Sequence, residues 1–515
     1  MDENRIDWRR LFPPAEIIGS PAPAVSGVCY DSREVVPGCV FVAVPGAMPP
    51  RSRDGHDFIC DALERGATVV VVQAGHRPKW AEAAASGRAA FVAVPDSRRA
   101  LAEIAAEYYG RPARRLTTIG VTGTDGKTTT IHLVDALLEA AGVPTGYLSS
   151  VQFKTAGVPQ LNATHMTTLE SPEVQTLLAD MAAAGCRAAV IEASSHGLAL
   201  NRVDSCEFDI AVFTMLSSDH LDFHGTVDEY LAAKGRLFAM LDEAVDKGVT
   251  KTAVLNADDP ASQDLRSRTR ARALTYGLEN AADVTATDVR PEGLSSAFTA
   301  VCEGQRVSVR LPLAGRHNVY NALAAFAVAH ALGLPLDAAV GGLSRFAGVP
   351  GRMERIDCGQ PFDVVVDIAS TPDALRRLLT VLRPLTRGRI IAVFGCAGER
   401  DPGRRDGMGR AAGELADFVV LTNEDPRSED PLAITDDIAR GLTAQGRREG
   451  ADFVRVLDRR EALEYAFRRA KAGDLVLAAG KGSEQSIVVG EEHIPWDERV
   501  VARELLTAMG WRERG

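Results

Sequence analysis

The segment Thr118-Ile-Gly-Val-Thr-Gly-Thr-Asp-Gly-Lys-Thr-Thr-Thr decides the fold of this 515-residue chain. It begins as a short apolar run, typical of a buried strand, and then turns through Gly123 and Gly126. A helical pattern follows from Thr129 to Ala141 and ends at Gly142-Val-Pro, a common C-terminal signal. Strand, glycine turn and helix in this order predict a nucleotide-binding α/β domain.

The same turn carries the side chains needed to bind a nucleoside triphosphate. Its glycines let backbone amides converge on phosphate oxygens, and the N-terminus of the helix adds partial positive charge. Lys127 can neutralise the β- and γ-phosphates, and the hydroxyl of Thr128 can bind Mg²⁺. The spacing departs from the usual phosphate loop, because Gly120 stands one residue before the position that normally holds glycine. A plain glycine-rich turn is the alternative, but strand, Gly-Lys-Thr and helix together favour ATP.

The composition excludes several other classes of protein. Hydrophobic residues make up 46% and charged residues 25%, as in ordinary soluble globular proteins. The formal net charge of −11 argues against a nucleic-acid-binding protein, which usually has a basic face. The charged N-terminus does not resemble a signal peptide, and no apolar run reaches the roughly 18 residues of a membrane-spanning helix. We therefore expect a cytoplasmic monomer that neither inserts into a membrane nor binds nucleic acid.

Two junctions divide the chain into three expected domains. Gly110-Arg-Pro-Ala-Arg-Arg follows the first block, and Phe346-Ala-Gly-Val-Pro-Gly-Arg separates the second block from the third. The expected domains are residues 1–112, 113–347 and 348–515. All three are predicted to be α/β: an N-terminal domain with short apolar runs, a central doubly wound ATP-binding domain and a C-terminal Rossmann-like domain.

Polar residues follow several of the expected strands. Glu192 ends Ala-Ala-Val-Ile, and Asp367 ends Val-Val-Val. Asn423 to Arg427 follow Phe-Val-Val-Leu-Thr, and Lys481 follows Leu-Val-Leu-Ala-Ala-Gly. In open parallel sheets, ligands bind just beyond the carboxyl ends of the strands. Such residues in two sheets predict a ligand cleft between two facing domains.

The order of motifs along the chain resembles the Mur ligase family and, within it, the MurE type. The phosphate segment matches that family's Gly-Thr-x-Gly-Lys-Thr-Thr loop, and the resemblance covers nearly the whole chain. The other matching segments are Asp31-Ser-Arg, Val40-Phe-Val-Ala-Val-Pro-Gly, Asp54-Gly-His-Asp-Phe, Thr167-Thr-Leu-Glu-Ser, Glu192-Ala-Ser-Ser-His-Gly-Leu, Asp219-His-Leu-Asp-Phe-His-Gly, Tyr230-Leu-Ala-Ala-Lys, Asn256-Ala-Asp-Asp-Pro, Gly315-Arg-His-Asn, Gly348-Val-Pro-Gly-Arg, Asp367-Ile-Ala-Ser-Thr-Pro-Asp, Phe394-Gly-Cys-Ala-Gly-Glu-Arg, Glu424-Asp-Pro-Arg and Gly480-Lys-Gly-Ser-Glu.

This resemblance implies an ATP-dependent acid–amino-acid ligase of peptidoglycan biosynthesis. Its substrates would be UDP-N-acetylmuramoyl-L-alanyl-D-glutamate and a diamino acid: meso-diaminopimelate, L-lysine or L-ornithine. The substrate carboxylate would attack the γ-phosphate of ATP to form an acyl phosphate and ADP, and the amine would then displace phosphate. ATP and Mg²⁺ would be required, together with a CO₂-derived carbamate on Lys234.

The matching motifs also imply the residues of each site. Catalysis would involve Lys127, Glu192, His220 and Lys234, and the metal ions would be held by Thr128, Glu192, His220 and carbamylated Lys234. The ATP site would comprise Gly123, Thr124, Asp125, Gly126, Lys127, Thr128, Thr129, Asn318, Asn321, Arg352 and Asp367. The N-terminal domain would bind the uridine nucleotide, and the residues contacting that substrate would be Ser32, Arg33, Thr167, Thr168, Ser194 and Arg202. The amino-acid site would comprise Arg400, Asp425, Arg427, Gly480 and Glu484.

Each assignment also has a structural alternative. Glu192 could form an ion pair at the strand end, His220 could be a structural histidine, and a helical lysine such as Lys234 is usually solvated. The residues assigned near the adenine, ribose and phosphates could be helix caps or turn residues. Arg427 could be a solvated residue after an Asp-Pro turn.

Several motif positions depart from the family pattern and leave the amino acid open. They are Asp125 for Asn, His317 for Phe, Ile368 for Tyr, Ser370 for His, Asp425 for Asn and Ser483 for His. Arg427 favours a distal carboxylate, as in diaminopimelate, whereas Asp425 would repel it and attract an ammonium group. The outcome depends on whether Arg427 pairs with Asp425 or with the substrate. If Asp425 set the preference, Asp425→Asn would shift kcat/KM toward diaminopimelate by about tenfold or more.

The sequence leaves two rival functions open. The serines at 370 and 483 suggest a paralogous amide ligase for another carboxylate, but the Asp31-Ser-Arg domain, expected to bind a uridine nucleotide, weighs against it. A catalytically weak nucleotide-binding homologue is the other rival, and the intact set Lys127, Thr128, Glu192, His220 and Lys234 argues against that. Phosphate release measured with and without the muramoyl dipeptide nucleotide would separate them.

Overall fold

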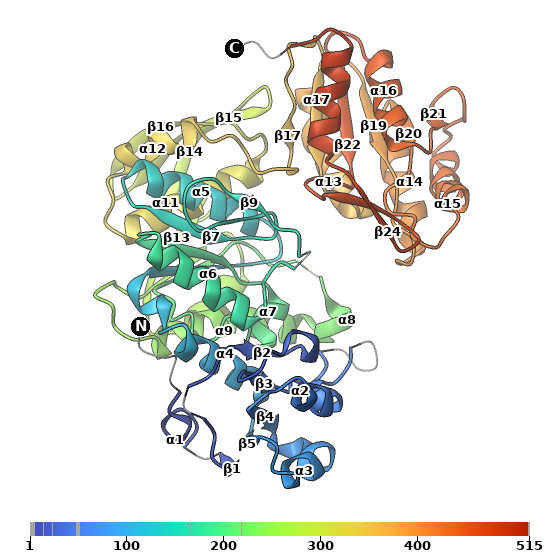
Figure 1. The fold of residues 1–515 in the computed structure, drawn as a ribbon. Helices are drawn as coiled ribbons and strands as arrows, with labels where there is room; N and C mark the ends of the chain where they lie inside the picture. The colour runs from blue at the N-terminus through green and yellow to red at the C-terminus, as the bar shows by residue number, and fades with distance from the viewer. Residues whose placement is uncertain are drawn as a thin grey trace. The chain divides into compact units, whose positions relative to one another are not determined.

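The structure is a computed structural model that describes residues 6–13, 15–22, 24–47, 52–164, 166–217 and 219–512. The chain forms two compact units, coloured along the sequence in Figure 1. The first comprises Met1–Asp288, Phe298–Val309 and His317–Arg345, and the second comprises Val289–Ala297, Arg310–Arg316 and Phe346–Gly515.

A five-stranded sheet forms the N-terminal part of the first unit, in the order β1-β5-β4-β3-β2. β2 to β5 are parallel, and β1 pairs antiparallel with β5. Both faces are covered, with Leu63 and Trp80 in the core on one face and Trp8 and Ile104 in the core on the other. The elements are α1 (Trp8–Leu11), β1 (Glu16–Ile18), β2 (Val28–Cys29), β3 (Val40–Val42), α2 (Ile59–Glu64), β4 (Val69–Gln73), α3 (Arg77–Ala85), β5 (Ala90–Val94) and α4 (Ser97–Tyr108).

An eleven-stranded sheet forms the central part, in the order β16-β15-β14-β13-β12-β11-β6-β10-β7-β8-β9. Strands β7, β10, β6 and β11 to β14 pair in parallel, as a doubly wound domain requires. The strands are β6 (Thr117–Thr122), β7 (Thr145–Leu148), β8 (Gln152–Lys154), β9 (Gln160–Leu161), β10 (Ala188–Glu192), β11 (Ile210–Phe213), β12 (Thr252–Asn256), β13 (Arg272–Gly277), β14 (Val284–Glu292), β15 (Ser295–Cys302) and β16 (Gln305–Leu311).

Helices cover the central sheet by burying their apolar faces. Leu178 of α6, Leu237 of α9 and Leu265 of α10 share one hydrophobic core. α5 packs against β6, β7 and β10, and α12 packs on α5. The helices are α5 (Lys127–Ala140), α6 (Ser171–Ala183), α7 (Ser195–Ala199), α8 (Leu221–His224), α9 (Val227–Glu243), α10 (Ala261–Ser267), α11 (Arg316–Ala331) and α12 (Leu336–Ser344).

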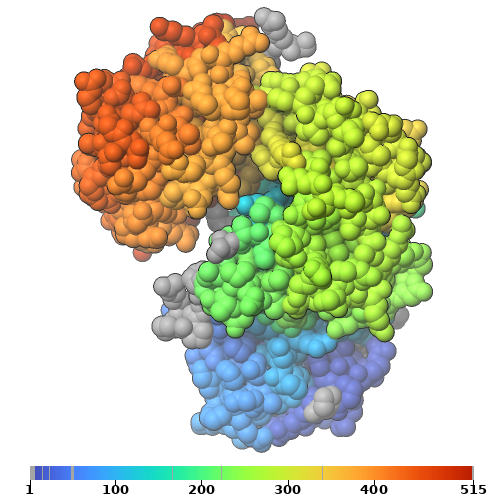
Figure 2. Space-filling model, turned by 180° about the vertical axis from the view of Figure 1, so that it is seen from behind, coloured from blue at the N-terminus to red at the C-terminus, as the bar shows by residue number. Residues whose placement is uncertain are grey.

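Polar contacts join the N-terminal and central parts of the first unit. The hydroxyl of Tyr30 donates to Glu173 at 2.9 Å, and the hydroxyl of Ser205 donates to Glu103 at 2.8 Å. In the space-filling view the blue N-terminal surface adjoins the green central surface (Figure 2). These contacts fix the expected uridine-binding part against the ATP-binding part within one unit.

The second unit contains a six-stranded sheet in the order β17-β18-β22-β19-β20-β21, which is parallel except for β17. Leu379 of α13, Met408 of α14 and Ile438 of α15 share one core, and residues of α16 and α17 share the other. The elements are β17 (Glu354–Arg355), β18 (Asp363–Asp367), α13 (Pro372–Leu382), β19 (Ile390–Phe394), α14 (Gly403–Leu415), β20 (Phe418–Leu421), α15 (Pro431–Ala444), β21 (Phe453–Arg455), α16 (Arg459–Arg469), β22 (Leu475–Ala479), β23 (Ser486–Val489), β24 (Glu492–Pro495) and α17 (Glu498–Ala508).

A buried ion pair braces the carboxyl ends of two strands in this unit. Arg459 and Glu498 are both fully buried and lie 2.8 Å apart. The Arg459 guanidinium also donates to the carbonyls of Asn423 after β20 and Ala479 at the end of β22, at 3.0 and 2.8 Å. These bonds hold the two segments that carry the expected amino-acid site.

The α/β class expected for all three parts is confirmed, whereas the expected domain boundaries remain a prediction. The helix expected from Thr129 begins earlier, at Lys127, because Gly126 adopts the left-handed conformation that ends the loop. Among the described residues, no helix is long and apolar enough to cross a membrane.

Candidate functional site

The phosphate loop of the first unit joins β6 to α5 through a backbone that only glycine accommodates. Gly123 and Gly126 have φ angles of +146° and +85°. A Cβ atom at Gly123 would lie 1.8 Å from the hydroxyl of Thr214, and one at Gly126 would lie 2.4 Å from the side-chain oxygen of Asn321. The loop is therefore packed tightly against two neighbouring segments, with its amides at the start of a helix.

This packing predicts different outcomes for two glycine substitutions at the ends of α5. Gly126→Ala should raise the KM for ATP by about tenfold or more, because both backbone strain and the clash with Asn321 displace the loop. Gly142→Ala is the matched control, since its φ of +76° imposes similar strain but no described atom lies within 4 Å of the new Cβ. Equal effects on the KM for ATP would show that the contact with Asn321 is unimportant.

Backbone and side-chain hydrogen bonds hold the rest of the loop. The amide of Thr124 donates to the carbonyl of Met215 at 2.7 Å, and its hydroxyl lies 3.1 Å from that of Tyr230. The Thr214 hydroxyl donates to the carbonyl of Asp125 at 2.6 Å. Lys127 folds back onto the loop, donating to the carbonyls of Gly123 and Thr124 at 3.2 and 2.8 Å. Its ammonium group therefore lies beside the amides expected to bind phosphate.

Thr128 and Glu192 form a cluster of oxygen atoms at the start of α5. The Thr128 hydroxyl is 3.1 Å from both carboxylate oxygens of Glu192 and 2.9 Å from the hydroxyl of Ser150. The amide of Ser150 donates to the same carboxylate at 2.8 Å, and Glu192 is only 2% exposed. A buried carboxylate beside a hydroxyl supplies the hard oxygen ligands that Mg²⁺ prefers, so these residues fit the expected metal.

Lys234 is buried inside the first unit rather than solvated on its helix. It is 1% exposed, and its ammonium nitrogen donates to the carbonyl of Gly123 at 2.7 Å. The same nitrogen lies 4.1 Å from the ring centroid of Tyr230. Burial and the nearby charge of Lys127 lower the pKa of Lys234 to about 6. The solvated-lysine alternative is therefore wrong, and the amine is largely neutral at neutral pH.

His220 lies beside this group in a cluster of aromatic and imidazole rings. Its ring centroid is 4.8 Å from that of His196 and 6.2 Å from that of Tyr230. The His220 side chain is 48% exposed, and its backbone adopts a left-handed conformation with φ of +53°. An exposed imidazole on a strained backbone is unusual for a purely structural histidine and is compatible with metal binding.

The remaining residues expected to bind ATP fall in both units. In the first, Asn318 and Asn321 are buried on α11, and the Asn321 amide donates to Asn318 at 3.1 Å. In the second, the carboxylate of Asp367 accepts from the backbone amides of Met353 and Ala369 at 2.7 and 2.8 Å. Burial raises the pKa of Asp367, and the positive charge of Arg352 partly offsets that effect. The structure thus places Asn318 beside Asn321 and Arg352 near Asp367.

Three of the residues expected to contact the uridine substrate form one group next to Glu192. The hydroxyl of Thr168 donates to the carbonyl of Glu192 at 2.7 Å and lies 2.9 Å from that of Ser194. Arg202 donates to the carbonyl of Thr168 at 3.2 Å and to Glu170 at 2.8 Å. Glu192, the expected metal ligand, is therefore adjacent to the residues expected to contact the substrate. Thr167 precedes Thr168 and is half-buried.

The other two lie in the N-terminal part of the unit. Ser32 is buried at the start of a short 3-10 turn, Ser32–Glu34. The exposed Arg33 side chain pairs with the carboxylate of Asp31 at 2.5 Å. Within the described part of the chain, neither residue forms a hydrogen bond or ion pair with the Thr168 group, so their shared role stays a prediction.

The expected amino-acid site lies at the carboxyl ends of β20 and β22 in the second unit. The ammonium group of Lys481 lies 2.9 Å from Asp425 and 2.6 Å from Glu484. The carboxylate of Glu424 is buried, and one of its oxygens has no hydrogen-bond partner among the described residues. A Cβ atom at Gly480 would lie 2.6 Å from that oxygen. Burial raises the pKa of Glu424 to about 7.

Arg427 does not pair with Asp425. Its nearest carboxylate is Glu399, at 4.0 Å, and its buried Nε has no hydrogen-bond acceptor among the described residues. The backbone of Arg427 has a φ of +53°, a left-handed conformation that is costly for a residue with a Cβ. A strained arginine with an unused donor is suited to bind a carboxylate from outside the protein. Arg400 is exposed on the loop after β19.

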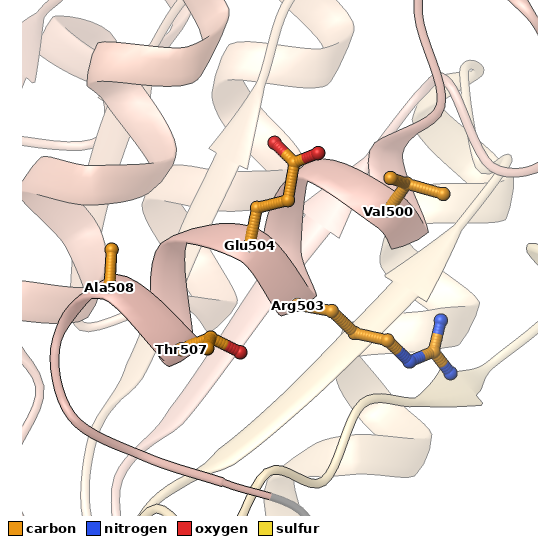
Figure 3. A pocket seen from close by; sticks show the side chains of 5 residues that line it. All are labelled: Val500, Arg503, Glu504, Thr507 and Ala508. Atoms are coloured by element: carbon orange, nitrogen blue, oxygen red, sulfur yellow. The ribbon is translucent and has the colours of Figure 1, made fainter.

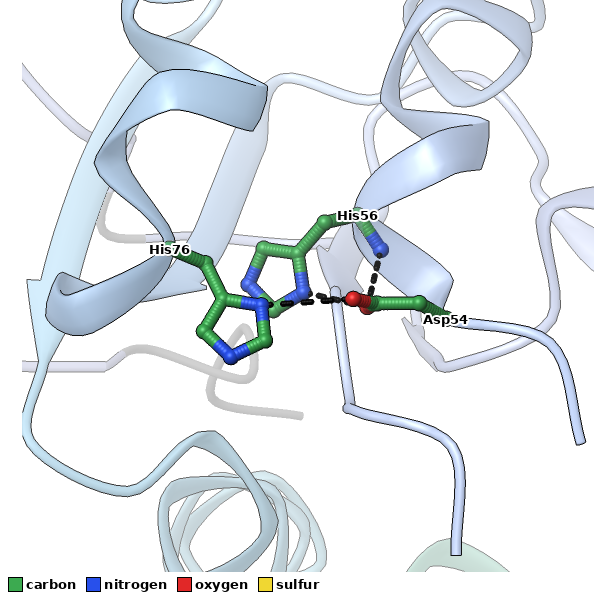
Figure 4. A group of neighbouring side chains, drawn as sticks. All are labelled: Asp54, His56 and His76. Atoms are coloured by element: carbon green, nitrogen blue, oxygen red, sulfur yellow. Dashed lines mark hydrogen bonds and ion pairs between the residues drawn. The ribbon is translucent and has the colours of Figure 1, made fainter. Parts of the chain in front are cut away.

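Two other features of the described residues do not form sites. Asp54, His56 and His76 approach each other closely (Figure 4), but both ring nitrogens of His56 are already used, by Asp54 at 2.7 Å and by the amide of Gln73 at 3.0 Å. Lys79 also lies 2.8 Å from Asp54, where a metal ion would have to bind. The cluster is a structural hydrogen-bond network.

The second feature is a hollow on the outer surface of α17 (Figure 3). All of its lining side chains project from that one helix, so it has no opposing wall. Two of its polar residues are engaged by neighbours, Arg503 with Glu354 at 3.4 Å and Glu504 with Arg460 at 2.8 Å. None of the expected site residues lines it.

Comparison with known proteins identifies the family. A model of the Mur ligase middle domain matches residues 121–329, the Mur ligase, glutamate ligase domain matches residues 351–482, and the Mur ligase family, catalytic domain matches residues 24–109. A UDP-N-acetylmuramyl-tripeptide synthetase from Roseiflexus sp. (strain RS-1) is 47% identical over 95% of this chain and 96% of its own length. The chain belongs to the Mur ligase family.

Further relatives of this Mur ligase carry a more specific name. A UDP-N-acetylmuramoyl-L-alanyl-D-glutamate--2,6-diaminopimelate ligase from Solibacter usitatus is 42% identical, with 95% of each chain covered. A solved structure of a ligase with that name superimposes with a TM-score of 0.67 at 32% identity, covering 98% of this chain and 99% of the other. The family consists of ATP-dependent, ADP-forming acid–amino-acid ligases, so the expected enzyme class is confirmed.

Several residues that the structure places in the candidate sites of this Mur ligase were assigned no role in a site from the sequence. Ser150 shares the Glu192 carboxylate, Tyr230 lies against Lys234, and Glu424 and Lys481 lie among the expected amino-acid residues. For Tyr230, Glu424 and Lys481 the signal was present, since all three stand inside matching motifs, and Glu424 and Lys481 also follow the ends of strands. Ser150 follows β7 in an ordinary loop, and its sequence context offers no comparable signal.

Proposed function

We propose that this protein is a ligase of the MurE type that joins a diamino acid to UDP-N-acetylmuramoyl-L-alanyl-D-glutamate, using ATP. The names of the relatives support this substrate pair, and the assembled Lys127, Thr128, Glu192 and Lys234 support the chemistry. The single observation that carries the proposal is the burial of Lys234 against the phosphate loop. We infer that the enzyme acts as a cytoplasmic monomer, because ATP drives the reaction and one chain supplies every expected residue.

The reaction has two steps that this arrangement supports. An oxygen of the glutamyl side-chain carboxylate attacks the γ-phosphorus of ATP, the bond to the bridging oxygen breaks, and ADP leaves. The amine of the diamino acid then attacks the acyl carbon, the bond to phosphate breaks, and one proton is released as the amide forms. Lys127 and the amides at the start of α5 stabilise negative charge on the transferred group. Thr168, Ser194 and Arg202 would orient the substrate beside Glu192.

Thr128, Glu192 and His220 are the residues that would hold magnesium. The metal would neutralise phosphate charge during transfer. Among the described residues, the Thr128 hydroxyl and the Glu192 carboxylate are already in contact, so no rearrangement is needed to present two oxygen ligands.

The environment of Lys234 supports the carbamate. An amine must be uncharged to attack CO₂, and it then loses a proton to give an anionic carbamate. Burial and Lys127 favour the uncharged amine, because they lower the pKa of Lys234 to about 6. The carbamate would place a negative charge beside the ammonium group of Lys127, with which Lys234 shares the carbonyl of Gly123. It would also supply a second anionic ligand near the phosphates.

Arg427 supports diaminopimelate as the amino acid. Because Arg427 does not pair with Asp425, its guanidinium is available for the distal carboxylate that lysine and ornithine lack.

Arg427→Lys should therefore raise the KM for diaminopimelate by about tenfold to a hundredfold, since lysine cannot reproduce a bidentate bond to a carboxylate. The KM for lysine, if the enzyme accepts it, should hardly change. Arg440→Lys, at an exposed arginine of the same unit, is the control. An equal loss with both amino acids would remove Arg427 from substrate recognition.

One assay tests the function itself. ATP turnover is measured with UDP-N-acetylmuramoyl-L-alanyl-D-glutamate and each of diaminopimelate, lysine and ornithine, with omission of each component as the control. Phosphate release that requires both the nucleotide and one diamino acid supports the proposal. Turnover with another carboxylate alone would favour a paralogous amide ligase, and binding of ATP without turnover would favour a nucleotide-binding homologue.

A further inference from the structure

Lys481 carries a buried positive charge in the middle of the expected amino-acid site. It is 1% exposed and stands two residues after the end of β22. Its ammonium nitrogen is 2.9 Å from a carboxylate oxygen of Asp425 and 2.6 Å from one of Glu484. A cation buried this deeply requires anionic partners, so the three side chains form one electrostatic unit.

The same unit fixes the turn that carries Arg427. The Asp425 oxygen that binds Lys481 also accepts from the amide of Val488 on β23, at 2.9 Å. The amide of Arg427 donates to the carbonyl of Val488 at 3.0 Å, and the amide of Gly490 donates to the carbonyl of Arg427 at 2.8 Å. The hairpin of β23 and β24 thus clamps Arg427 in its strained conformation. Asp425 is therefore held by hydrogen bonds from Lys481 and Val488 and is not an unpaired anion.

We propose that Lys481 is a positioning residue that determines which amino acid the enzyme accepts. Its ammonium group offsets the negative charge of Asp425 and Glu484, and Arg427 can then attract a distal carboxylate without opposition from these two side chains. The inference rests on the proposed function, since it takes this group of residues to be the amino-acid site. The positive charge of Lys481 explains how a site for a distal carboxylate can contain an aspartate at position 425.

Two buried polar atoms of this group are available to a ligand. One oxygen of the buried Glu424 carboxylate and the buried Nε of Arg427 have no hydrogen-bond partner among the described residues. A carboxyl acceptor and a cationic donor together match a ligand end that carries both an ammonium group and a carboxylate. Lysine and ornithine have no distal carboxylate that could accept a hydrogen bond from Arg427. Without Lys481, the uncompensated carboxylates would repel the ligand's carboxylate and favour a simple ammonium group.

The test is the ratio of kcat/KM for diaminopimelate to kcat/KM for lysine. Lys481→Met is expected to lower this ratio by about tenfold or more, mainly through a higher KM for diaminopimelate. Lys471→Met removes an exposed lysine from the same unit and should leave the ratio unchanged. Asp425→Asn in the presence of Lys481 should change the ratio by less than about threefold, because Lys481 already offsets that charge.

A second variant covers the case in which Lys481→Met does not fold. The triple variant Asp425→Asn, Glu484→Gln, Lys481→Met removes all three charges together, and its ratio should fall less than that of Lys481→Met, because neither Asp425 nor Glu484 is then charged. An unchanged ratio in a folded Lys481→Met enzyme, or a ratio lost equally in the triple variant, would overturn the role of Lys481. A wild-type enzyme that uses no diamino acid would instead overturn the proposed function, so the two failures are distinguishable.

Discussion

Replacing Lys234 with arginine is expected to lower the rate of ligation by about 10³-fold or more, because guanidinium cannot form a carbamate. Arginine would also keep a permanent charge at a position that is 1% exposed and lies beside Lys127. The measurement is kcat at saturating ATP, muramoyl dipeptide nucleotide and amino acid. Uptake of ¹³C-labelled bicarbonate, followed by carbon NMR, should give a carbamate signal in the wild type and none in the variant.

Two further variants separate loss of the carbamate from loss of structure. Lys234→Ala should be nearly inactive but partly rescued by acetate or another short carboxylate, which can occupy the position of the carbamate. Lys154→Arg is the matched control, since Lys154 is a buried lysine of the same unit that pairs with Asp135 and Glu139 at 2.7 Å. That variant keeps its ion pairs and should retain activity. Full activity of Lys234→Arg would mean that the lysine acts only as a cation or not at all.

Most of the secondary structure near the sites was predictable, because it depends on local patterns. β18, β20 and β22 occupy the apolar runs that end at Asp367 or precede Asn423 and Lys481. The strand-end rule also predicted the position of Glu192, which ends β10. Boundaries shifted where a turn intervened, as at Lys127, which begins α5 directly after a left-handed glycine.

Side-chain environments were less predictable, since they depend on residues far apart in the sequence. The sequence pattern makes Lys234 an ordinary helical lysine, and only the fold brings it to the carbonyl of Gly123, 111 residues away. In the same way, Lys481 reaches Asp425 across 56 residues. The sequence leaves open whether Arg427 pairs with Asp425, whereas in the structure Asp425 pairs with Lys481. The tenfold effect considered for Asp425→Asn is accordingly not expected.

The second large effect is expected for Lys127→Ala, which should abolish ligation. Removing the cation beside the phosphate-binding amides costs transition-state stabilisation worth about 10³-fold or more in rate. ATP binding, measured by direct titration, should weaken less than the rate falls, because the amides at the start of α5 remain. The substitution should also raise the pKa of Lys234, since the charge of Lys127 is one cause of its low value.

Because Lys127 affects the pKa of Lys234, the carbamate on Lys234 must be measured as a control for Lys127→Ala. A higher pKa of Lys234 leaves less uncharged amine to react with CO₂, so the assay is run at saturating bicarbonate and the carbamate is quantified by carbon NMR. A variant that carries a full carbamate and is still inactive has lost only the phosphate-binding cation. A variant that regains activity as the carbamate forms would show that Lys127 acts mainly through Lys234. Near-normal turnover without added bicarbonate would be incompatible with any role for Lys127 in binding ATP.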